Sequence, residues 1–496
     1  MTTQPSTTPK IDPGILSERH LGRYFSLLTP EGGIRWWHVL LTYAISHGFI
    51  LACWNALYWD DWLVYSGGPD GVRDYFESCT NCTLPFRSEV EAVLIAPGPW
   101  LMRVLTFCIF PLIAFLFQRF LRRTAWLNEH EIGGYVLLVL FLPMYGARVA
   151  HIDFQYSVSL LLFMLGGLMT LSSRVLIRLV AIIPIFWSMF VASLQVFVVA
   201  LILVLLIRMI QRPKATRFGS TDVLLILILA VSPIVHRYVL PNFLSSIRVV
   251  DGYNSIRPAF LIRGLLFTFL LSCPIVVMLF RHLSQRHVSR ENWQLGIGLS
   301  ILALGTFPYL AVGHFANFSD WILPLLPDES DWNSRHQLLQ PFGFGLTLLS
   351  VAQRFRSTIK SVTSLILIAL LPLNVATYSG YYLDSLKQRE FLAQVEANKN
   401  LIENDTVLII GDDATRFNAR NRGVRAYEWT AMLSQGVGRD IIADSNSVQF
   451  CAESHPSKLV RVTATRGRLR SLLSRKIGIV VTFEDLPTCS LAEKSS

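Results

Sequence analysis

Long apolar runs that contain no Lys, Arg, Asp or Glu dominate this sequence. Examples are residues 36–59, 154–173, 264–280 and 361–383. A helix rises 1.5 Å per residue, so each run has about the length needed to cross ~30 Å of hydrocarbon. We count roughly eleven such segments along the chain. The pattern therefore predicts an α-helical polytopic membrane protein.

A short basic segment follows every second apolar run. They are residues 119–123, 174–178, 208–217, 281–290 and 354–360. The positive-inside rule places such loops in the cytoplasm, and the loops between them on the outer side. The outer loop that starts at Tyr58 carries seven acids and two bases up to Glu91, which agrees with this orientation. We expect the main outer loops at residues 58–96 and 314–337.

The stretch between Arg178 and Arg208 tests this topology, because its 29 residues carry no charge although both ends are expected in the cytoplasm. A tight hairpin of two short helices satisfies both ends, with a turn near residues 193–195 and a bend at Pro184. Short helices of this kind persist when they pack inside a bundle. The alternative is one tilted span, which would invert every later loop.

Three regions follow from this map. Residues 1–34 form a polar cytoplasmic segment, and the run after it is too long for a signal peptide, so we expect no cleavage. Residues 35–380 form the transmembrane domain. Residues 381–496 are more charged and read as a small extracytoplasmic α/β domain, with strands at 406–410 and 477–483 and a helix at 469–475. Gly436-Val437-Gly438 lacks the setting of a nucleotide-binding loop.

Composition and charge support a membrane protein over a nucleic-acid-binding one. Hydrophobic residues make up 52% of the chain and charged residues only 16%. The net charge of +10 would favour nucleic acid if the bases formed one surface. They lie instead in the short loops between spans, where they report orientation, so we expect no nucleic-acid partner.

The cysteines divide according to the same map. Three fall within spans: Cys53, Cys108 and Cys273. Four fall in segments expected outside: Cys79, Cys82, Cys451 and Cys489. In an oxidising compartment the outer cysteines can pair, as Cys79 with Cys82 and Cys451 with Cys489.

The segment Tyr58-Trp59-Asp60-Asp61-Trp62 opens the first outer loop. One interpretation is an aromatic belt at the headgroup level with two solvated acids. Adjacent carboxylates repel each other, however, unless a cation or a proton donor faces them. The second interpretation makes Asp60 or Asp61 a general base that takes a proton from an acceptor hydroxyl, with Tyr58 and Trp62 in contact with substrate.

Five arginines near the expected outer ends of spans are candidates for holding a phosphate of a lipid-linked sugar. They are Arg103, Arg148, Arg257, Arg263 and Arg335. A charge within a span is costly, which favours a function for it. The alternative is that each arginine extends to the interface and has a structural role only.

A dense ionisable cluster, Arg148, His151 and Asp153, falls at the outer turn between the third and fourth spans. It is either a hairpin neutralised by an Arg–Asp pair or a wall of the active site that supplies charge and a titratable imidazole. A His-x-Asp pair alone does not specify a metal site.

A second polar segment, residues 331–337, lies just before the tenth span and contains Arg335 and His336. A guanidinium group matches phosphate oxygens with two parallel hydrogen bonds, so Arg335 is the best single candidate for the donor phosphate. The alternative is a helix N-terminus capped by Asp331 or Ser334, with Arg335 exposed.

The architecture resembles the GT-C superfamily of membrane glycosyltransferases. The shared features are an acidic motif directly after the first span, many further spans and an external C-terminal domain. Asp60-Asp61-Trp62 is similar to the motif of bacterial enzymes that use polyprenyl-phosphate sugars, in which an acid of the first outer loop is implicated as the base. The arginine motif of that family is matched only loosely by Gly98-Pro99-Trp100-Leu101-Met102-Arg103.

The resemblance implies a transferase in the bacterial inner membrane that moves a sugar from a polyprenyl-phosphate donor to a glycan, lipid or protein acceptor. The lipid phosphate leaves already ionised, so one carboxylate base is enough, unlike the paired carboxyl groups of glycoside hydrolysis. The sequence shows no Asp-x-Asp ligand pair, and we expect no metal cofactor. Three alternatives stay open: a polysaccharide polymerase or ligase, a secondary transporter with inverted halves, and a structural or assembly protein of the membrane.

Overall fold

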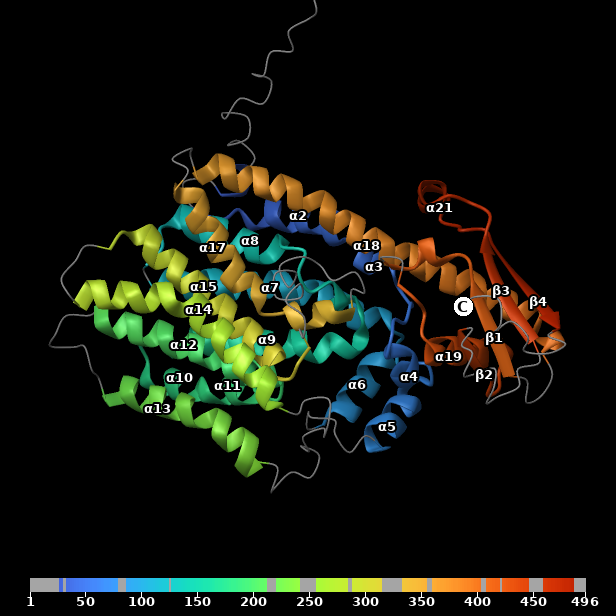
Figure 1. Cartoon of the computed structure of the whole chain (residues 1–496), viewed down its shortest axis with the longest axis horizontal. Helices are drawn as coiled ribbons and strands as arrows, with labels where there is room; N and C mark the ends of the chain where they lie inside the picture. Colours follow the sequence, from blue (N-terminus) through green and yellow to red (C-terminus); the bar gives the residue numbers. More distant parts are fainter. Residues whose placement is uncertain are drawn as a thin grey trace, which may run out of the picture.

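The computed structural model contains a helix bundle followed by a small sheet (Figure 1). The structure describes residues 26–29, 33–78, 86–124, 126–211, 220–240, 256–283, 288–314, 332–354, 359–402, 407–419, 422–445 and 458–485. The predicted cysteine pairs, Cys79–Cys82 and Cys451–Cys489, lie outside the described residues. So does most of the predicted outer loop at 314–337.

Seven helices in the described part of the chain are long and apolar enough to cross a membrane. They are α7 (Trp100–Thr124), α9 (Phe154–Thr170), α12 (Ala192–Gln211), α13 (Ser220–Ile234), α14 (Pro258–Leu283), α15 (Arg290–Ala311) and α18 (Ile359–Ala397). Short turns lengthen two of them: η3 (His151–Asp153) precedes α9, and the π-helix η5 (Val235–Val239) continues α13. The length and apolar composition of these seven helices are typical of an integral membrane protein.

The remaining predicted spans correspond to shorter helices. They are α2 (Trp36–His47) with α3 (Phe49–Ala52), α8 (Glu129–Phe141), α10 (Val175–Val180) with α11 (Ile182–Ser188), and α17 (Gln340–Arg354). Helix α8 has 13 residues, which gives about 20 Å of length, and most of its side chains are buried. Helices this short fit a bundle in which neighbouring helices surround them.

The break expected between Arg178 and Arg208 is present but lies earlier than predicted. Helix α11 ends at Ser188 and α12 begins at Ala192, so residues 193–195 belong to a helix. The Gln195 side-chain amide donates a 2.9 Å hydrogen bond to the Met189 carbonyl and closes the turn. Gln195, which the sequence predicts in the turn, therefore closes the turn from within α12.

Three of the predicted basic loops meet at one end of the bundle, which we call the basic end. Arg122 pairs with Glu129 at 2.7 Å, and Arg290 pairs with Glu131 at 2.5 Å. The Gln353 amide donates to the other oxygen of Glu131 at 3.1 Å. Arg122, Arg290 and Gln353, which border three of the predicted basic loops, therefore lie on the same side of the bundle.

The C-terminal unit contains a four-stranded sheet in the order β2-β1-β3-β4. Its strands are β1 (Val407–Asp412), β2 (Ile442–Ser445), β3 (Lys458–Ala464) and β4 (Ile479–Asp485), and its helices are α19 (Ala426–Val437) and α21 (Arg468–Ser474). Strand β1 is parallel to β2 and β3, and β4 is antiparallel to β3. The predicted α/β unit is confirmed.

Helix α18 joins the bundle to this unit without a break (Figure 1). It continues past Gly380, where we expected the last span to end, up to Ala397. Glu390 accepts hydrogen bonds from the N–H groups of Ile477 at 2.6 Å and Gly478 at 2.8 Å. The end of α18 is thus part of the C-terminal unit, and the predicted boundary at 380 falls inside a helix.

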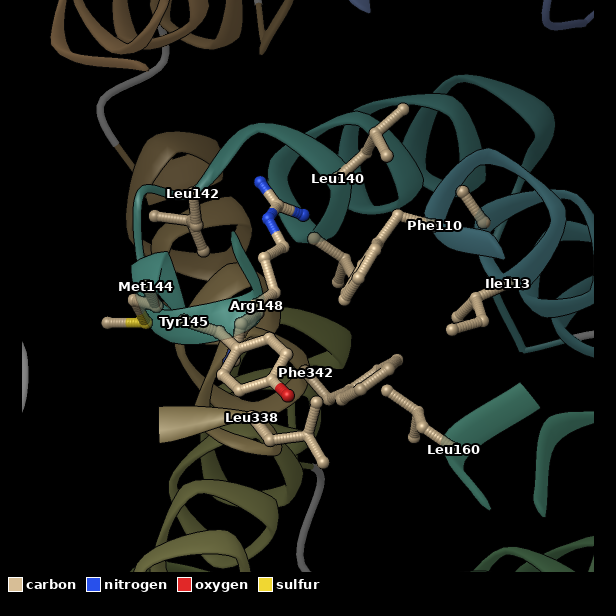
Figure 2. A pocket seen from close by; sticks show the side chains of 13 residues that line it. Phe110, Ile113, Leu140, Leu142, Met144, Tyr145, Arg148, Leu160, Leu338 and Phe342 are labelled. Atoms are coloured by element: carbon tan, nitrogen blue, oxygen red, sulfur yellow. The ribbon is translucent and has the colours of Figure 1, made fainter. Parts of the chain in front are cut away.

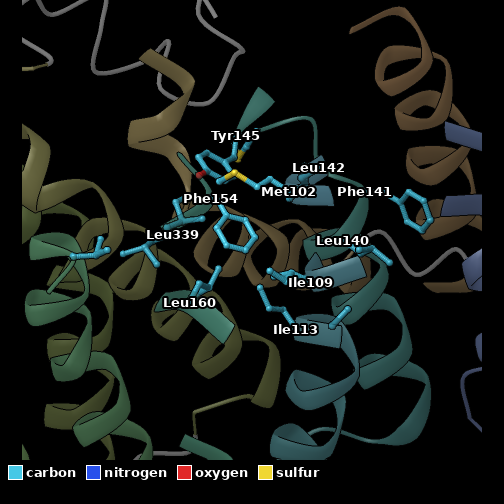
Figure 3. Close-up of a cluster of buried hydrophobic side chains, with 14 of the residues drawn as sticks. Met102, Ile109, Ile113, Leu140, Phe141, Leu142, Tyr145, Phe154, Leu160 and Leu339 are labelled. Atoms are coloured by element: carbon cyan, nitrogen blue, oxygen red, sulfur yellow. The ribbon is translucent and has the colours of Figure 1, made fainter. Parts of the chain in front are cut away.

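The end of the bundle opposite the basic end carries the elements that position the candidate site. These elements are α4 (Asp61–Tyr65), α5 (Gly68–Ser78), α6 (Arg87–Ile95), η2 (Gly146–Val149) and η8 (Trp332–Gln337). They lie over an apolar core in which Met102 of α7, Phe141 of α8 and Phe154 of α9 are buried (Figure 3). We call this end the site end.

Candidate functional site

The acidic motif adopts a conformation that separates its two carboxylates. Trp59 has a φ of 50°, in the left-handed region that side chains rarely adopt, and α4 starts two residues later at Asp61. Asp61 Oδ2 accepts a 3.2 Å hydrogen bond from the Tyr58 N–H, which closes this turn. Adjacent residues in such a turn face different surroundings.

Asp61 is fully buried, at 0% exposure, and connects two parts of the chain. Its Oδ2 accepts the His151 N–H and its Oδ1 accepts the Ile152 N–H, each at 2.9 Å. Burial raises the pKa of Asp61 to about 7, although these N–H groups and the charge of Arg103 favour the ionised form. Asp61 therefore attaches the first loop to η3 and is enclosed by protein.

Asp60 is only partly buried and faces the C-terminal unit. The Tyr427 hydroxyl of α19 donates a 2.7 Å hydrogen bond to Asp60 Oδ1. Burial and this bond to a carboxylate raise the pKa of Tyr427 far above its usual value, so Tyr427 remains the proton donor. Of the two carboxylates, Asp60 is the one bonded to a hydroxyl group.

A buried ion network lies directly behind this contact. The Trp59 N–H donates to Glu428 Oε2 at 3.2 Å, and Arg422 pairs with Glu428 at 2.7 Å. Arg422 also pairs with Asp384 of α18 at 3.1 Å, and its guanidinium lies 5.1 Å from the centroid of a Trp59 ring. The network holds the first loop, α18 and α19 together.

Arg103 is buried and uses its guanidinium to join the first loop to η2. One Nη donates to the Val149 carbonyl at 2.5 Å and the other donates to the Ala56 carbonyl. The guanidinium also lies 5.1 Å from the Tyr58 ring centroid. Both Nη groups are occupied by backbone, so the structure gives Arg103 a positioning role.

Tyr58 and Trp62, predicted to contact substrate, are buried in the protein. The Tyr58 hydroxyl donates to the Tyr381 carbonyl at 2.7 Å, which attaches the loop to α18. Trp62 belongs to the large apolar core of the bundle. Both side chains stabilise the loop that presents Asp60.

Arg148 projects from η2 into a small cavity with apolar walls (Figure 2). Its Nε donates to the Tyr378 hydroxyl at 2.6 Å, and its guanidinium lies 4.4 Å from the Phe110 ring centroid. Within the described part of the chain, no carboxylate forms an ion pair with Arg148. The cavity volume of about 30 Å³ accommodates roughly one or two water molecules.

Of the two interpretations of this cluster, the hairpin neutralised by an Arg148–Asp153 pair is not the arrangement found. Asp153 is buried, and its Oδ2 has no hydrogen-bond partner among the described residues. His151 is also buried, and its ring stands edge-on to Tyr65 at 5.7 Å.

Arg335 and His336 lie on η8, which is fixed to η2. Ser334 Oγ accepts the Ala147 N–H at 2.7 Å, which joins η8 to η2. Arg335 is partly buried, and its Nε donates to His336 Nε2 at 3.2 Å. The His336 ring stacks on His314 at 4.5 Å, and Arg335 and burial lower the pKa of His336 well below its usual value.

Arg257 and Arg263 have a different setting from the other three arginines. Both are exposed at the start of α14, and their guanidinium groups lie about 6 Å from the Phe260 ring centroid, at 5.9 and 6.0 Å. Helix α14 packs mainly against α15. Arg148 thus lies on η2, Arg103 donates to a carbonyl of η2, and Arg335 lies on η8, which contacts η2. Arg257 and Arg263 lie on the surface of α14.

Several residues at the site were not anticipated from the sequence. Tyr427, Glu428 and Arg422 reach the acidic motif from the C-terminal unit. Arg87 and Glu91 of α6 form a buried 2.7 Å ion pair, and Arg87 also donates to the Ile152 carbonyl. Only the density of charge around Arg422 to Glu428 gave any local signal. No group of three or more metal-ligating side chains occurs among the described residues.

No family model matches the sequence, and no curated protein matches it.

Proposed function

We propose that this chain is a membrane glycosyltransferase that moves a sugar from a polyprenyl-phosphate donor to a glycan, lipid or protein acceptor, with Asp60 as the general base. The supporting observation is the Tyr427–Asp60 hydrogen bond. A partly exposed carboxylate at the site end accepts a proton-donating hydroxyl at 2.7 Å, the geometry that a base requires of an acceptor hydroxyl.

The reaction is a single displacement. The acceptor O–H bond breaks and its proton moves to Asp60, while the acceptor oxygen forms a bond to the anomeric carbon of the donor sugar. The bond from that carbon to the phosphate oxygen breaks, and its electron pair leaves on the lipid phosphate. One base is sufficient, because the phosphate leaves as a stable anion.

Two arginines support the leaving group in this proposal. Arg335 is partly buried on η8, and its Nε donates to the His336 ring at 3.2 Å. Its planar guanidinium matches phosphate oxygens with two parallel hydrogen bonds. Arg148 is a buried cation whose Nε bonds to a neutral tyrosine hydroxyl. A buried guanidinium that has no ion pair among the described residues, as at Arg148, is costly, and an anion compensates it. We assign the donor phosphate to Arg335 first and to Arg148 second.

Asp61 and Arg103 position the base in this scheme and do not contact the reacting atoms. We further propose that the four shorter apolar segments complete roughly eleven membrane passes, with the basic end in the cytoplasm and the site end outside. Asp60 then lies at the outer membrane–water boundary, where a lipid-linked sugar presents its anomeric carbon.

The proposal is tested by following the donor in proteoliposomes that contain the full chain. Polyprenyl phosphates that carry radiolabelled hexoses are supplied with a lipid and glycan extract of the cell envelope, and release of the label from the lipid phosphate is measured. Consumption of one donor by the wild-type protein but not by D60N supports the proposal. Equal consumption by both proteins, or no consumption of any donor, contradicts it.

A further inference from the structure

Helix α21 of the C-terminal unit exposes two large apolar side chains to its surroundings. Leu469 is 71% exposed and Leu473 is 77% exposed. Their spacing of four residues places them on the same face of the helix. Among the described residues, comparable exposure occurs on apolar helices of the bundle, as at Leu176 (73%) and Phe280 (74%). On the surface of a soluble unit, such a pair indicates contact with an apolar environment.

Basic residues precede and follow these two leucines in the sequence. Residues 466–476 contain Arg466, Arg468, Arg470, Arg475 and Lys476, and no acid occurs between residues 454 and 483. All of these except Arg466 are exposed. Within the described part of the chain, none of the four exposed bases forms an ion pair. The surface of α21 is therefore apolar and strongly positive at once.

The position of α21 relates this surface to the membrane. Arg468 Nη2 lies 3.7 Å from the point that a Cβ atom on Gly380 of α18 would occupy. Residues 361–383 of α18 carry no charge, and the partly exposed Tyr382 lies at the end of this run, just before Asp384. Tyrosines are enriched at the membrane–water boundary. Helix α21 therefore lies beside α18 near the end of its uncharged run (Figure 1).

We propose that α21 is a surface anchor that docks the C-terminal unit on anionic lipid headgroups of the membrane. Leu469 and Leu473 enter the interfacial layer, and Arg468, Arg470, Arg475 and Lys476 contact lipid phosphates. Leucines and bases combined on one short helix are the chemistry of interfacial helices. The anchor holds α19 over the first loop, and does not depend on the reaction that we propose above.

Hydrogen exchange of the full chain in nanodiscs tests this proposal. We expect amides of residues 466–476 to exchange at least about tenfold more slowly in nanodiscs with anionic lipid than in nanodiscs of zwitterionic lipid alone, because bound α21 opens less often. The double variant L469S/L473S removes the apolar contact without opening a cavity, because both side chains are exposed. It is expected to lose most of this protection.

The matched control is Ile442→Ser, which removes a 62% exposed side chain from β2 on the same unit. This variant is expected to keep the lipid-dependent protection of α21. Equal exchange of residues 466–476 in both kinds of nanodisc overturns the proposal. So does protection that appears only when two copies of the chain share a nanodisc, because α21 would then contact protein.

Discussion

The Tyr427 hydroxyl donates a 2.7 Å hydrogen bond to Asp60 Oδ1, although 367 residues separate the two in the chain. The bond places a residue of the C-terminal unit directly on the acidic motif of the first loop. Glu428 strengthens the contact by accepting the Trp59 N–H at 3.2 Å. An acceptor hydroxyl that binds Asp60 must therefore displace the Tyr427 hydroxyl or bind the carboxylate together with it.

Replacement of Asp60 by Asn is expected to lower the rate of sugar transfer by about 10²-fold to 10⁴-fold, the usual contribution of a general base. The amide keeps the shape of the side chain and still accepts the Tyr427 hydrogen bond. Its thermal unfolding midpoint should therefore stay close to that of the wild type. The measurement is the initial rate of donor consumption in proteoliposomes. Full activity of D60N would remove Asp60 from the reaction.

Replacement of Tyr427 by Phe tests whether this hydroxyl competes with the acceptor. A hydrogen bond to a charged group contributes about 1.5–3 kcal/mol, so its removal should lower the KM for acceptor by roughly tenfold or more. The value of kcat should change little, because Asp60 keeps its position through the backbone of Trp59. A large fall in kcat would instead show that Tyr427 positions the base.

The stability of the protein should depend on the ionisation of Asp61. Its pKa is raised from 3.8 to about 7 in the folded state, so the folded state binds more protons than the unfolded state between these values. The contribution of this group to the free energy of unfolding is therefore complete below pH ~4 and declines as the pH rises to ~7. At about 1.4 kcal/mol per pKa unit, the total is a few kcal/mol.

The unfolding midpoints of the wild type and D61N, measured in detergent from pH 4 to pH 8, check this prediction. The asparagine does not titrate. The unfolding midpoint of the wild type should therefore fall relative to that of D61N as the pH rises to ~7, and the difference should then stay constant. A difference that is independent of pH would contradict a raised pKa at Asp61.

Replacement of Arg335 by Lys keeps the charge but removes the planar pair of donors. If Arg335 binds the donor phosphate with two hydrogen bonds, the KM for donor should rise by roughly tenfold, since one charged hydrogen bond contributes at least about 1.5 kcal/mol. Arg263→Lys, on the exposed surface of α14, serves as the control and should leave the KM for donor unchanged. An unchanged KM in R335K would assign the phosphate to another residue.

Replacement of Arg422 by Met should detach the C-terminal unit from the bundle. Arg422 pairs with Asp384 and Glu428, and its loss leaves two buried carboxylates without the cation that pairs with both of them, at a cost of about 3–5 kcal/mol. The measurement is the rate of limited proteolysis within residues 403–485. Arg461→Met is the control, because its pairs with Asp413 and Glu484 lie on the surface and contribute little. Equal proteolysis of the two variants would contradict a structural role for the network.

The sequence by itself determined which segments are helices of a membrane protein and which form a sheet. Hydrophobic runs and their bounding charges are local properties, so the long helices, the basic end and the C-terminal α/β unit could all be predicted. The lengths of individual helices could not be predicted in the same way, because a run of apolar residues does not show where α18 ends or how short α8 is. The place of the acidic motif, just after the first apolar run, was also visible in the sequence.

Only the tertiary structure decided what each charged residue contacts. Asp60 and Asp61 are adjacent and chemically identical, yet Asp61 is enclosed by N–H groups of residues 90 and 91 positions away while Asp60 meets Tyr427. The sequence left open whether Arg148 pairs with Asp153, and in the structure Arg148 donates instead to Tyr378 of α18. Such contacts join distant parts of the chain, and local periodicity carries no information about them.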